Sequence, residues 1–307
     1  MAIRGSRVDE GGTHRYGLIV VSAAGRPVRP ADACPFVQPT RSDSAGMKFL
    51  FLGDIVGKPG MNAVVQNVQR IREELDLDYV IANAENASDG SGLMPKQFER
   101  LIDSGIDGVT LGDHIFRRKE IITTLEKSDR IVKPANYPEE ASGRKWTLIK
   151  RSGRRPLAIV SIMGRVFMRP VNCPFQALDD VLAEIEPHTD QILVDVHAEA
   201  TSDKQCLGRY LDGKVTAVLG THTHVPTADS CVLPNRTAFQ CDVGMCGPYE
   251  SIIGRDIERV THTTRTAEPC HFHVATGDVR LCGAIVESDG EGRALSIERF
   301  ERKVIIN

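Results

Sequence analysis

The feature that most constrains this chain is a regular alternation of apolar strand patterns and amphipathic helix patterns from Met47 onward. The run MKFLFL at 47–52 is apolar throughout, which is typical of a strand buried on both faces. Residues 58–76 follow it with apolar side chains three or four positions apart, which indicates a helix. The same order of strand and helix recurs at 78–105 and at 108–129, so the sequence predicts βαβ units.

The rest of the chain first continues this pattern and then changes it. Apolar strand candidates at 155–164, 191–196 and 215–219 alternate with helical segments. From Ala228 to Ile305, shorter runs separated by turn residues predict mostly antiparallel strands. We therefore expect an α/β fold in which two packed sheets are flanked by helices.

Polar side chains of the kinds that bind metals stand at the carboxyl end of one predicted strand after another. This is the edge where open α/β sheets assemble their sites, because short loops from several strands converge there. Any one of these residues alone would be explained as a helix cap or a turn residue, but their recurrence makes coincidence improbable. They are Asp54, Glu85, Asn86, Asp113, His114, His197, His222 and His224.

His222 and His224 stand one residue apart, just after the apolar run at 215–219. Because residues i and i+2 of a strand point to the same face, we expect both imidazoles to emerge together at the strand edge and converge on one point. Carboxylates, one amide and imidazoles suit borderline divalent ions such as Mn, Fe or Zn rather than an all-oxygen calcium cage. Their number exceeds the needs of one tetrahedral ion and fits two ions bridged by a carboxylate.

Composition excludes several classes of function. A formal net charge of -3 and 5% aromatic residues provide neither a basic field nor stacking platforms for a tightly held nucleic-acid polymer. No apolar run approaches the length of a membrane span. The cysteines form no CxxC pair and are interpreted as reduced thiols, so we expect a cytoplasmic protein. Cys241 and Cys246 flank DVGM and offer alternative metal ligands, although small buried residues are the stronger interpretation.

The first 46 residues differ from the remainder. They mix Arg, Gly, Pro and Ser without periodicity, and their apolar stretch YGLIVVSAA is short and poorly flanked for a signal peptide. We expect residues 1–46 to be a disordered leader or the result of a misassigned start before Met47, with a single domain at 47–307. A cleaved secretory segment is the alternative.

Five motifs in order, GDIVG, NAEN, GDH, DVHAEATS and GTHTH, resemble those of the calcineurin-like metallophosphoesterases. The resemblance is strongest to their YmdB-like branch of bacterial phosphodiesterases. It runs from Met47 almost to the C-terminus and includes PANYP, GRVF, DVGMCGP and SIIG. It implies a metallophosphoesterase domain with a four-layer αββα sandwich, in which two mixed sheets hold two metal ions, Fe or Mn in the first place and Zn as a further option.

The resemblance also assigns roles to the strand-end residues. One ion would be held by Asp54, Glu85 and His224, with Asn86 nearby. Glu85 would bridge to a second ion held by Asp113, His197 and His222. His114 resembles the general acid, and its alternative is a histidine that only supports the site. Val56 stands where the superfamily usually has a further histidine, so one ion has a thinner ligand set.

Position 113 departs from the family pattern, because the chain has GDH where GNH is common. Three carboxylates against two divalent ions leave a formal charge of about +1, whereas an asparagine would leave about +2, so the pull on a phosphate anion is weaker. The extra carboxylate would instead suit a pair that contains trivalent iron. Alternatively, Asp113 turns toward Arg117 or Arg118 and ligates little.

The implied reaction is phosphodiester hydrolysis by a hydroxide that two metal ions activate, with His114 assisting the leaving group. The implied substrate is a small phosphodiester, namely a 2',3'- or 3',5'-cyclic nucleotide. The loop at 88–95 either contacts the nucleoside or is an ordinary connection.

Two other classes of function compete with this interpretation. One is a metal-containing regulatory or signalling protein with low turnover. The other is a phosphomonoesterase or protein phosphatase, for which Arg165 and Arg169 would supply a phosphate grip unless they are merely solvated. The sequence leaves the oligomeric state open, a homo-oligomer included.

Overall fold

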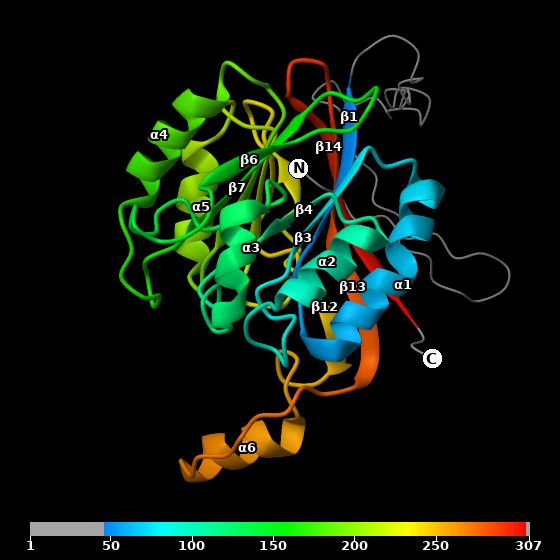
Figure 1. Cartoon of the computed structure of the whole chain (residues 1–307), viewed down its shortest axis with the longest axis vertical. Helices are drawn as coiled ribbons and strands as arrows, with labels where there is room; N and C mark the ends of the chain where they lie inside the picture. The colour runs from blue at the N-terminus through cyan, green and yellow to red at the C-terminus, as the bar shows by residue number, and fades with distance from the viewer. Residues whose placement is uncertain (1–45, 305–307) are drawn as a thin grey trace, which may run out of the picture. The chain divides into compact units, whose positions relative to one another are not determined.

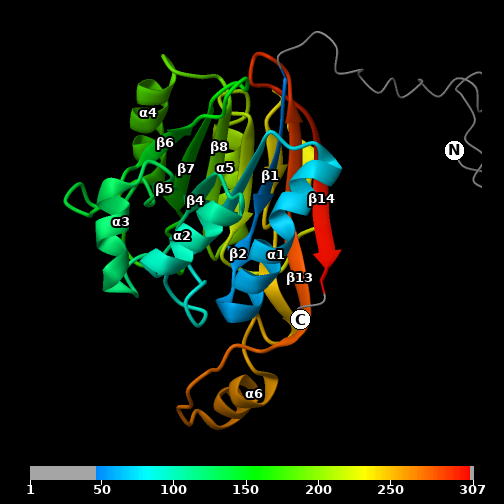
Figure 2. The ribbon, with the colours of Figure 1, turned by 45° about the vertical axis from the view of Figure 1, so that its right-hand side comes forward.

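A computed structural model describes residues 46–304. The predicted leader at 1–46 therefore lies outside the described residues, apart from Gly46. Two mixed β-sheets and the helices that cover them make up the fold (Figures 1 and 2).

The first sheet has eight strands in the order β2-β12-β13-β1-β3-β4-β5, with β14 paired to β13. They are β1 (Met47–Leu52), β2 (Asp54–Ile55), β3 (Tyr79–Asn83), β4 (Gly108–Thr110), β5 (Ile131–Val132), β12 (Met245–Glu250), β13 (Gly277–Ser288) and β14 (Ala294–Lys303). Strands β1, β3, β4 and β5 run parallel, so their carboxyl ends share one edge. Strand β13 is antiparallel to its neighbours β1, β12 and β14.

The second sheet has six strands in the order β10-β11-β9-β8-β7-β6. They are β6 (Trp146–Ile149), β7 (Leu157–Met163), β8 (Ile192–His197), β9 (Ala217–Thr221), β10 (Cys231–Val232) and β11 (Ala238–Gln240). Strands β7, β8, β9 and β11 are parallel, and β6 and β10 close the edges antiparallel.

Helices cover the outer faces of the two sheets, and α6 projects beyond them (Figure 2). The helices are α1 (Gly57–Leu75), α2 (Pro95–Ser104), the 3-10 helix η2 (Lys119–Ile121), α3 (Ile122–Lys127), α4 (Pro174–Ile185), α5 (Thr201–Tyr210) and α6 (Ile257–Thr266). Helices α1 and α2 pack on the first sheet, and α4 and α5 on the second. The predicted α/β fold with two mixed sheets between helices is confirmed.

Strand β1 shows why its sequence is apolar at every position. Phe49 and Phe51 point into the core between the sheets, whereas Leu50 and Leu52 point to the core under α1 and α2. Because successive side chains of a strand alternate between faces, a strand covered on both sides needs an unbroken apolar run. The helix pattern of 58–76 is confirmed as well, with Val64, Val68 and Ile71 buried in α1.

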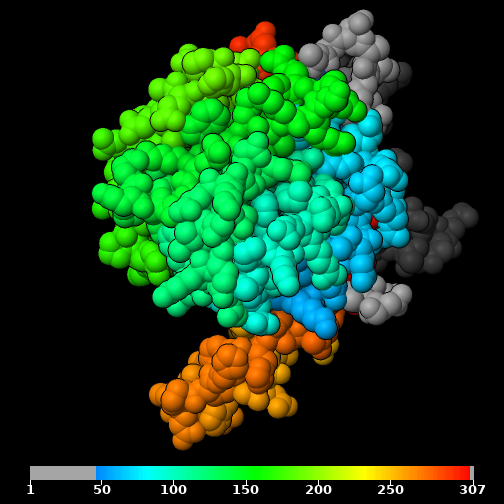
Figure 3. All heavy atoms as spheres, viewed as in Figure 1, coloured from blue at the N-terminus to red at the C-terminus, as the bar shows by residue number. Residues whose placement is uncertain are grey.

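The prediction for the last third of the chain was right in part. Strands β12 to β14 pair mostly antiparallel, but β11 and β12 also form parallel pairs with β9 and β2. Helix α6 was missed. It projects from the body of the molecule, as the orange segment of Figures 1 and 3 shows, and it buries none of its residues. Only two of its residues, Ile257 and Val260, are apolar, which is too few for a helix pattern to stand out in the sequence.

Candidate metal centre

The strand-end residues predicted from the sequence come together in the structure. Asp54 lies in β2, Glu85 and Asn86 follow β3, and Asp113 and His114 follow β4, all on the first sheet. His197 ends β8, and His222 and His224 follow β9 on the second sheet. The site is therefore built jointly by the carboxyl ends of both sheets, as expected for an α/β fold.

One part of the site, here called the first cluster, consists of Glu85, Asp113, His197 and His222. One potential ligand atom from each lies within 4.8 Å of the others. The Nε2 atom of His197 is 3.2 Å from Glu85 Oε1, 3.2 Å from Asp113 Oδ1 and 3.0 Å from His222 Nδ1. This mixture of two carboxylates and two imidazoles is a donor set that borderline divalent ions take.

The second cluster consists of Asp54, Asn86 and His224, and all three side chains are buried. The amide Nδ2 of Asn86 is 3.3 Å from Asp54 Oδ1 and 3.3 Å from His224 Nε2. It is also 3.1 Å from Oε1 of Glu85, which places that carboxylate between the two clusters. A half-turn of the amide would aim its oxygen, instead of its nitrogen, at a cation in this position.

His114 lies beside both clusters. Its Nδ1 is 2.7 Å from Asn86 Oδ1 and 3.3 Å from Glu85 Oε1, and its Nε2 is 3.6 Å from Asp113 Oδ2. Its backbone N–H donates to Glu85 Oε2 at 2.9 Å. Burial would lower the pKa of His114, but the hydrogen bond and charge of Glu85 and the charge of Asp113 raise it overall. The imidazole is thus poised to carry a proton at the edge of the site.

Asp195 and Thr221, which lie behind the site, determine how the ring nitrogens of His197 are protonated. Burial raises the pKa of Asp195 to about 6, against opposing contributions from His197, Thr110 and Thr221, so its carboxylate only accepts hydrogen bonds at neutral pH. The Thr221 hydroxyl donates to Asp195 Oδ1 at 2.7 Å, and it therefore accepts from Nδ1–H of His197 at 2.8 Å. This leaves Nε2 of His197 facing the carboxylates of the first cluster.

The ionised carboxylates of the site favour the binding of positive charge. Burial would raise the pKa of Glu85, but His197 and His114 lower it to about 2. Burial is likewise outweighed at Asp54, mainly by His224, and at Asp113 by His197 and His222, so both carboxyl pKa values fall far below their usual range. In return, Glu85 and Asp113 overcome burial and raise the pKa of His197 well above its usual value. The carboxylates that hold a proton on His197 would equally hold a metal cation in its place.

The sequence-based geometry of the two histidines was wrong. Strand β9 ends at Thr221, and His222 and His224 follow in a loop with φ angles of 95° and 65°. His222 therefore joins the first cluster and His224 the second, rather than sharing one strand face. Such left-handed backbone is strained in non-glycine residues and persists where the surroundings hold it, often at functional sites.

A carboxylate that sequence reasoning missed as a site residue holds this histidine loop. Oδ2 of Asp242 accepts from the backbone N–H of Thr223 at 3.0 Å and from its hydroxyl at 2.6 Å. The same oxygen pairs with the fully buried Nζ of Lys204 at 2.8 Å. Asp242 belongs to the DVGMCGP motif, which was the available signal.

Asp113 faces the histidines of the site and not the nearby arginines. Arg118 pairs instead with Asp89 at 3.2 Å. A Cβ atom on Gly112 would lie 2.2 Å from the ring of His197, so only a glycine before Asp113 lets that ring pass. The alternative in which Asp113 pairs with an arginine is therefore not what the structure contains.

Several further sequence-based candidates can now be placed. Glu199, which was not predicted, contacts Nε2 of His222 with Oε2 at 3.2 Å from a half-exposed position. Cys241 and Cys246 are buried, and the Cys246 thiol contacts the backbone oxygen of Cys282, in line with a packing role.

The loop at 88–95 is tied down by an arginine. The guanidinium of Arg255 donates to the backbone oxygens of Asp89, at 2.9 Å, and Gly90, at 2.5 Å. Half of the residues of the loop are buried. Arg255 thus holds the backbone of this loop, and a contact between the loop and a nucleoside stays a prediction. Arg165 and Arg169 are exposed.

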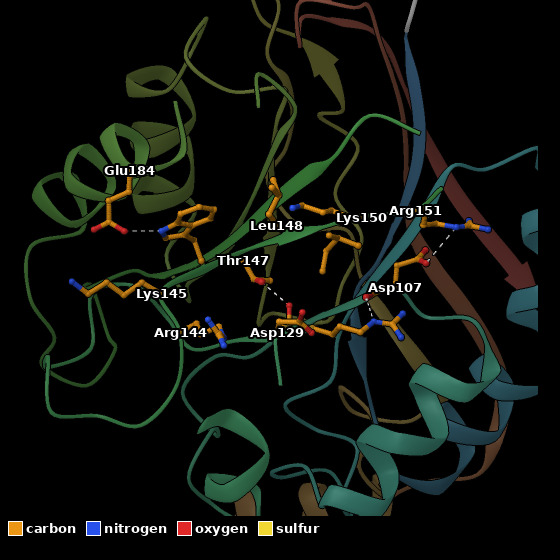
Figure 4. A pocket seen from close by; sticks show the side chains of 12 residues that line it. Asp107, Asp129, Arg144, Lys145, Thr147, Leu148, Lys150, Arg151 and Glu184 are labelled. Carbon is orange, nitrogen blue, oxygen red and sulfur yellow. Dashed lines mark hydrogen bonds and ion pairs between the residues drawn. The ribbon is translucent and has the colours of Figure 1, made fainter. Parts of the chain in front are cut away.

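A hollow of about 750 Å³ lies away from this centre, beside β6 (Figure 4). It is rich in cationic side chains, and several of them are engaged within the protein. Arg130 donates to the backbone oxygens of Asp107 and Ile106, both at 2.7 Å, and Arg151 donates to the backbone oxygen of Asp78 at 2.6 Å. The indole of Trp146 donates to Glu184 at 2.7 Å. These contacts stabilise this edge of the fold.

Comparisons with known proteins agree with the geometry. A family model described as "YmdB-like protein" matches residues 50–300. The 2',3'-cyclic-nucleotide 2'-phosphodiesterase of Bacillus subtilis is 42% identical over 255 residues, which cover 83% of this chain and 96% of that protein. A putative phosphatase/phosphodiesterase of Mycoplasma pneumoniae is 33% identical over 79% of this chain and 88% of its own length.

Solved structures show the same fold. A hypothetical protein from Thermus thermophilus matches with a TM-score of 0.78 and 41% identity, over 84% of this chain and 100% of that chain. A phosphatase from Mycoplasma pneumoniae matches with a TM-score of 0.79 and 30% identity, over 85% of this chain and 95% of that chain. Among residues 46–304, no helix has the length and apolar character to cross a bilayer.

Proposed function

The chain belongs to the YmdB-like family, and from that premise and the strand-end geometry we propose that it is a metal-dependent phosphodiesterase acting on a small cyclic nucleotide. The observation that carries the proposal is the convergence of three ionised carboxylates and three imidazoles on one edge, where only Asp113 and His222 among them are partly exposed. Such a set is stable only with compensating positive charge.

The residues present fit two metal ions. Glu85, Asp113, His197 and His222 would hold one, and Asp54, Asn86, His224 and the shared Glu85 the other. The mixed oxygen and nitrogen donors suit Fe or Mn, with Zn as the alternative. Lys204 and Asp242 keep the histidine loop in its strained conformation, and Thr221 keeps the His197 proton on Nδ1, away from the metal position.

When bound, the metal pair would supply Lewis-acid stabilisation of the phosphoryl oxygens and a nucleophilic water of lowered pKa. The protein's own contribution is a proton donor. In the structure Oδ1 of Asn86 lies 2.7 Å from Nδ1 of His114 and accepts from its N–H. A cationic His114 therefore carries a second proton on Nε2, which lies 3.6 Å from Asp113 Oδ2. We assign His114 as the general acid on this geometry.

The substrate class rests on the Bacillus relative, whose name specifies 2',3'-cyclic nucleotides. The absence of a basic field argues against a nucleic-acid polymer as a stable partner. We further propose that residues 47–307 form the catalytic domain, since β1 at its start pairs with β13 near its end, and that the protein works in the cytoplasm.

The test is a substrate panel with the metal-loaded protein. Hydrolysis of 2',3'-cyclic AMP is expected to exceed that of p-nitrophenyl phosphate, a phosphomonoester. It should disappear in His197→Ala and persist in His188→Ala, a histidine on the surface beside Trp146. Two metal ions per chain without turnover of any diester would overturn the catalytic proposal in favour of a regulatory protein, and faster monoester hydrolysis would favour a phosphatase.

A further inference from the structure

Phe167 occupies a position that neither folding nor the catalytic centre explains. Its side chain is 88% exposed, and its backbone φ is 62°. Met168 donates its backbone N–H to Arg165 at 3.3 Å, so residues 165–168 form a turn with Phe167 third. Glycine is the residue such a turn favours at that place, because positive φ costs a bulky side chain free energy.

The turn is fixed in place next to a proposed metal ligand. Oδ2 of Asp203 accepts the backbone N–H groups of Arg165 and Val166, at 2.7 and 2.9 Å. Gly164, directly before the turn, donates its N–H to the backbone oxygen of His197 at 3.0 Å. A loop held from both sides in this way can maintain a strained residue at its tip.

The reach from the metal centre to Phe167 is short. Strand β7 ends at Met163, which pairs in register with His197. Phe167 is four residues further along, so its Cα lies within roughly 14 Å of the Met163 Cα even in a fully extended chain, and the turn makes the path shorter. The turn that carries Phe167 therefore starts at the edge that carries the metal ligands.

We propose that Phe167 is the platform on which the nucleobase of the substrate stacks, an inference that rests on the proposed function. A phosphodiester held by the metal centre projects its nucleoside outward, where an exposed aromatic ring on a fixed turn meets the flat face of a base. Stacking tolerates any base, because every base has a π face. The platform would raise affinity for nucleotides over base-free cyclic phosphates without selecting one base.

The test compares one reaction on two substrates. The ratio of kcat/KM for 2',3'-cyclic AMP to that for ribose 2',3'-cyclic phosphate should fall about 5- to 140-fold in Phe167→Ala, as expected for one lost stacking contact. The fall should lie mainly in KM, and Phe167→Trp should restore the ratio. Val166→Ala, which changes the neighbouring exposed side chain of the same turn, should leave the ratio unchanged.

Two further measurements separate the possible failures. Phe167→Gly removes the strained side chain, so it should lower the ratio as Phe167→Ala does while its melting temperature stays equal or rises. An unchanged ratio in Phe167→Ala, or an equal fall in Val166→Ala, would overturn the platform. If the wild-type protein hydrolyses neither substrate, the proposed function fails, and titration calorimetry with adenosine 3'-phosphate and inorganic phosphate then decides. A loss of nucleotide binding alone in Phe167→Ala supports the platform, and equal binding overturns it.

Discussion

The two clusters of the metal centre differ in how far the protein closes them off. In the second cluster the side chain of Asp54 is fully buried and that of His224 is 11% exposed. In the first cluster His222 is 21% and Asp113 is 19% exposed, and Glu199 reaches His222 from the surface. The second cluster is thus held by the fold, whereas the first is the face that a substrate can approach.

The histidines of the two clusters are also oriented by different kinds of group. His224 is oriented by a backbone oxygen, because its Nδ1 lies 3.0 Å from the oxygen of Ile253. Among residues 46–304, the polar contacts of the His222 ring are with carboxylates and another imidazole. We infer that an ion in the second cluster would exchange slowly and serve structure, and that an ion in the first would be the more labile one.

The largest effect is expected at Glu85, the residue that the two clusters share. Glu85→Gln removes the one charge that both clusters share, so kcat on a cyclic nucleotide should fall by more than about 10³-fold, beyond the 10- to 100-fold typical of residues that only orient a ligand. Elemental analysis should show loss of both ions. Glu139→Gln, on an exposed carboxylate paired with Lys145, is the control and should keep activity and metal.

The next effect distinguishes the two clusters by replacing one histidine of each. His224→Ala should lower both metal content and the melting temperature, because it strands the buried Asp54 carboxylate without its partner. His222→Ala should cost metal and activity but little stability, since its site is open to water. Elemental analysis and thermal unfolding distinguish the two. Two ions per chain in both variants would mean that these histidines are not ligands.

A smaller effect is expected at the loop that contributes one histidine to each cluster. Asp242→Asn weakens the hold on Thr223, which lies between the two strained histidines. We expect metal affinity to fall about 10- to 100-fold, as for other residues that orient ligands. Excess metal should then restore kcat, which it would not do for a lost ligand. Asp229→Asn is a useful control because it touches the neighbouring Thr227 and Cys241 only.

The smallest effect is expected at Asp113, which belongs to the first cluster. Asp113→Asn adds one formal positive charge at nearly constant shape, so with divalent ions activity should rise, within about tenfold, or the pH optimum should fall. Lost activity together with lost iron would show that Asp113 is matched to a more highly charged metal pair. A variant unchanged in metal content, pH profile and rate would leave Asp113 as a bystander.

The sequence was sufficient for the parts of this molecule that depend on periodicity. Alternating strand and helix patterns predicted which segments are parallel, and parallel strands place His197 and Asp113 at one edge whatever the loops do. It was insufficient where a local rule is broken. The left-handed backbone of His222 and the turn at Phe167 depend on backbone N–H groups that donate to the carboxylates of Asp242 and Asp203, which no spacing in the chain reveals.

One consequence of the fold concerns how long the protein persists in the cell rather than its catalysis. The carboxylate of Asp195, on the second sheet, accepts from Asn83 at 3.0 Å and from Thr110 at 2.6 Å, both on the first sheet. The proposed ligands straddle the same junction, so metal binding and global unfolding are linked equilibria. At a free metal concentration of 100 times Kd, this linkage would add about 2.7 kcal/mol to the free energy of unfolding. A cell short of metal would then expose this chain to its proteases more often, so that scarcity would lower the amount of the protein as well as its activity.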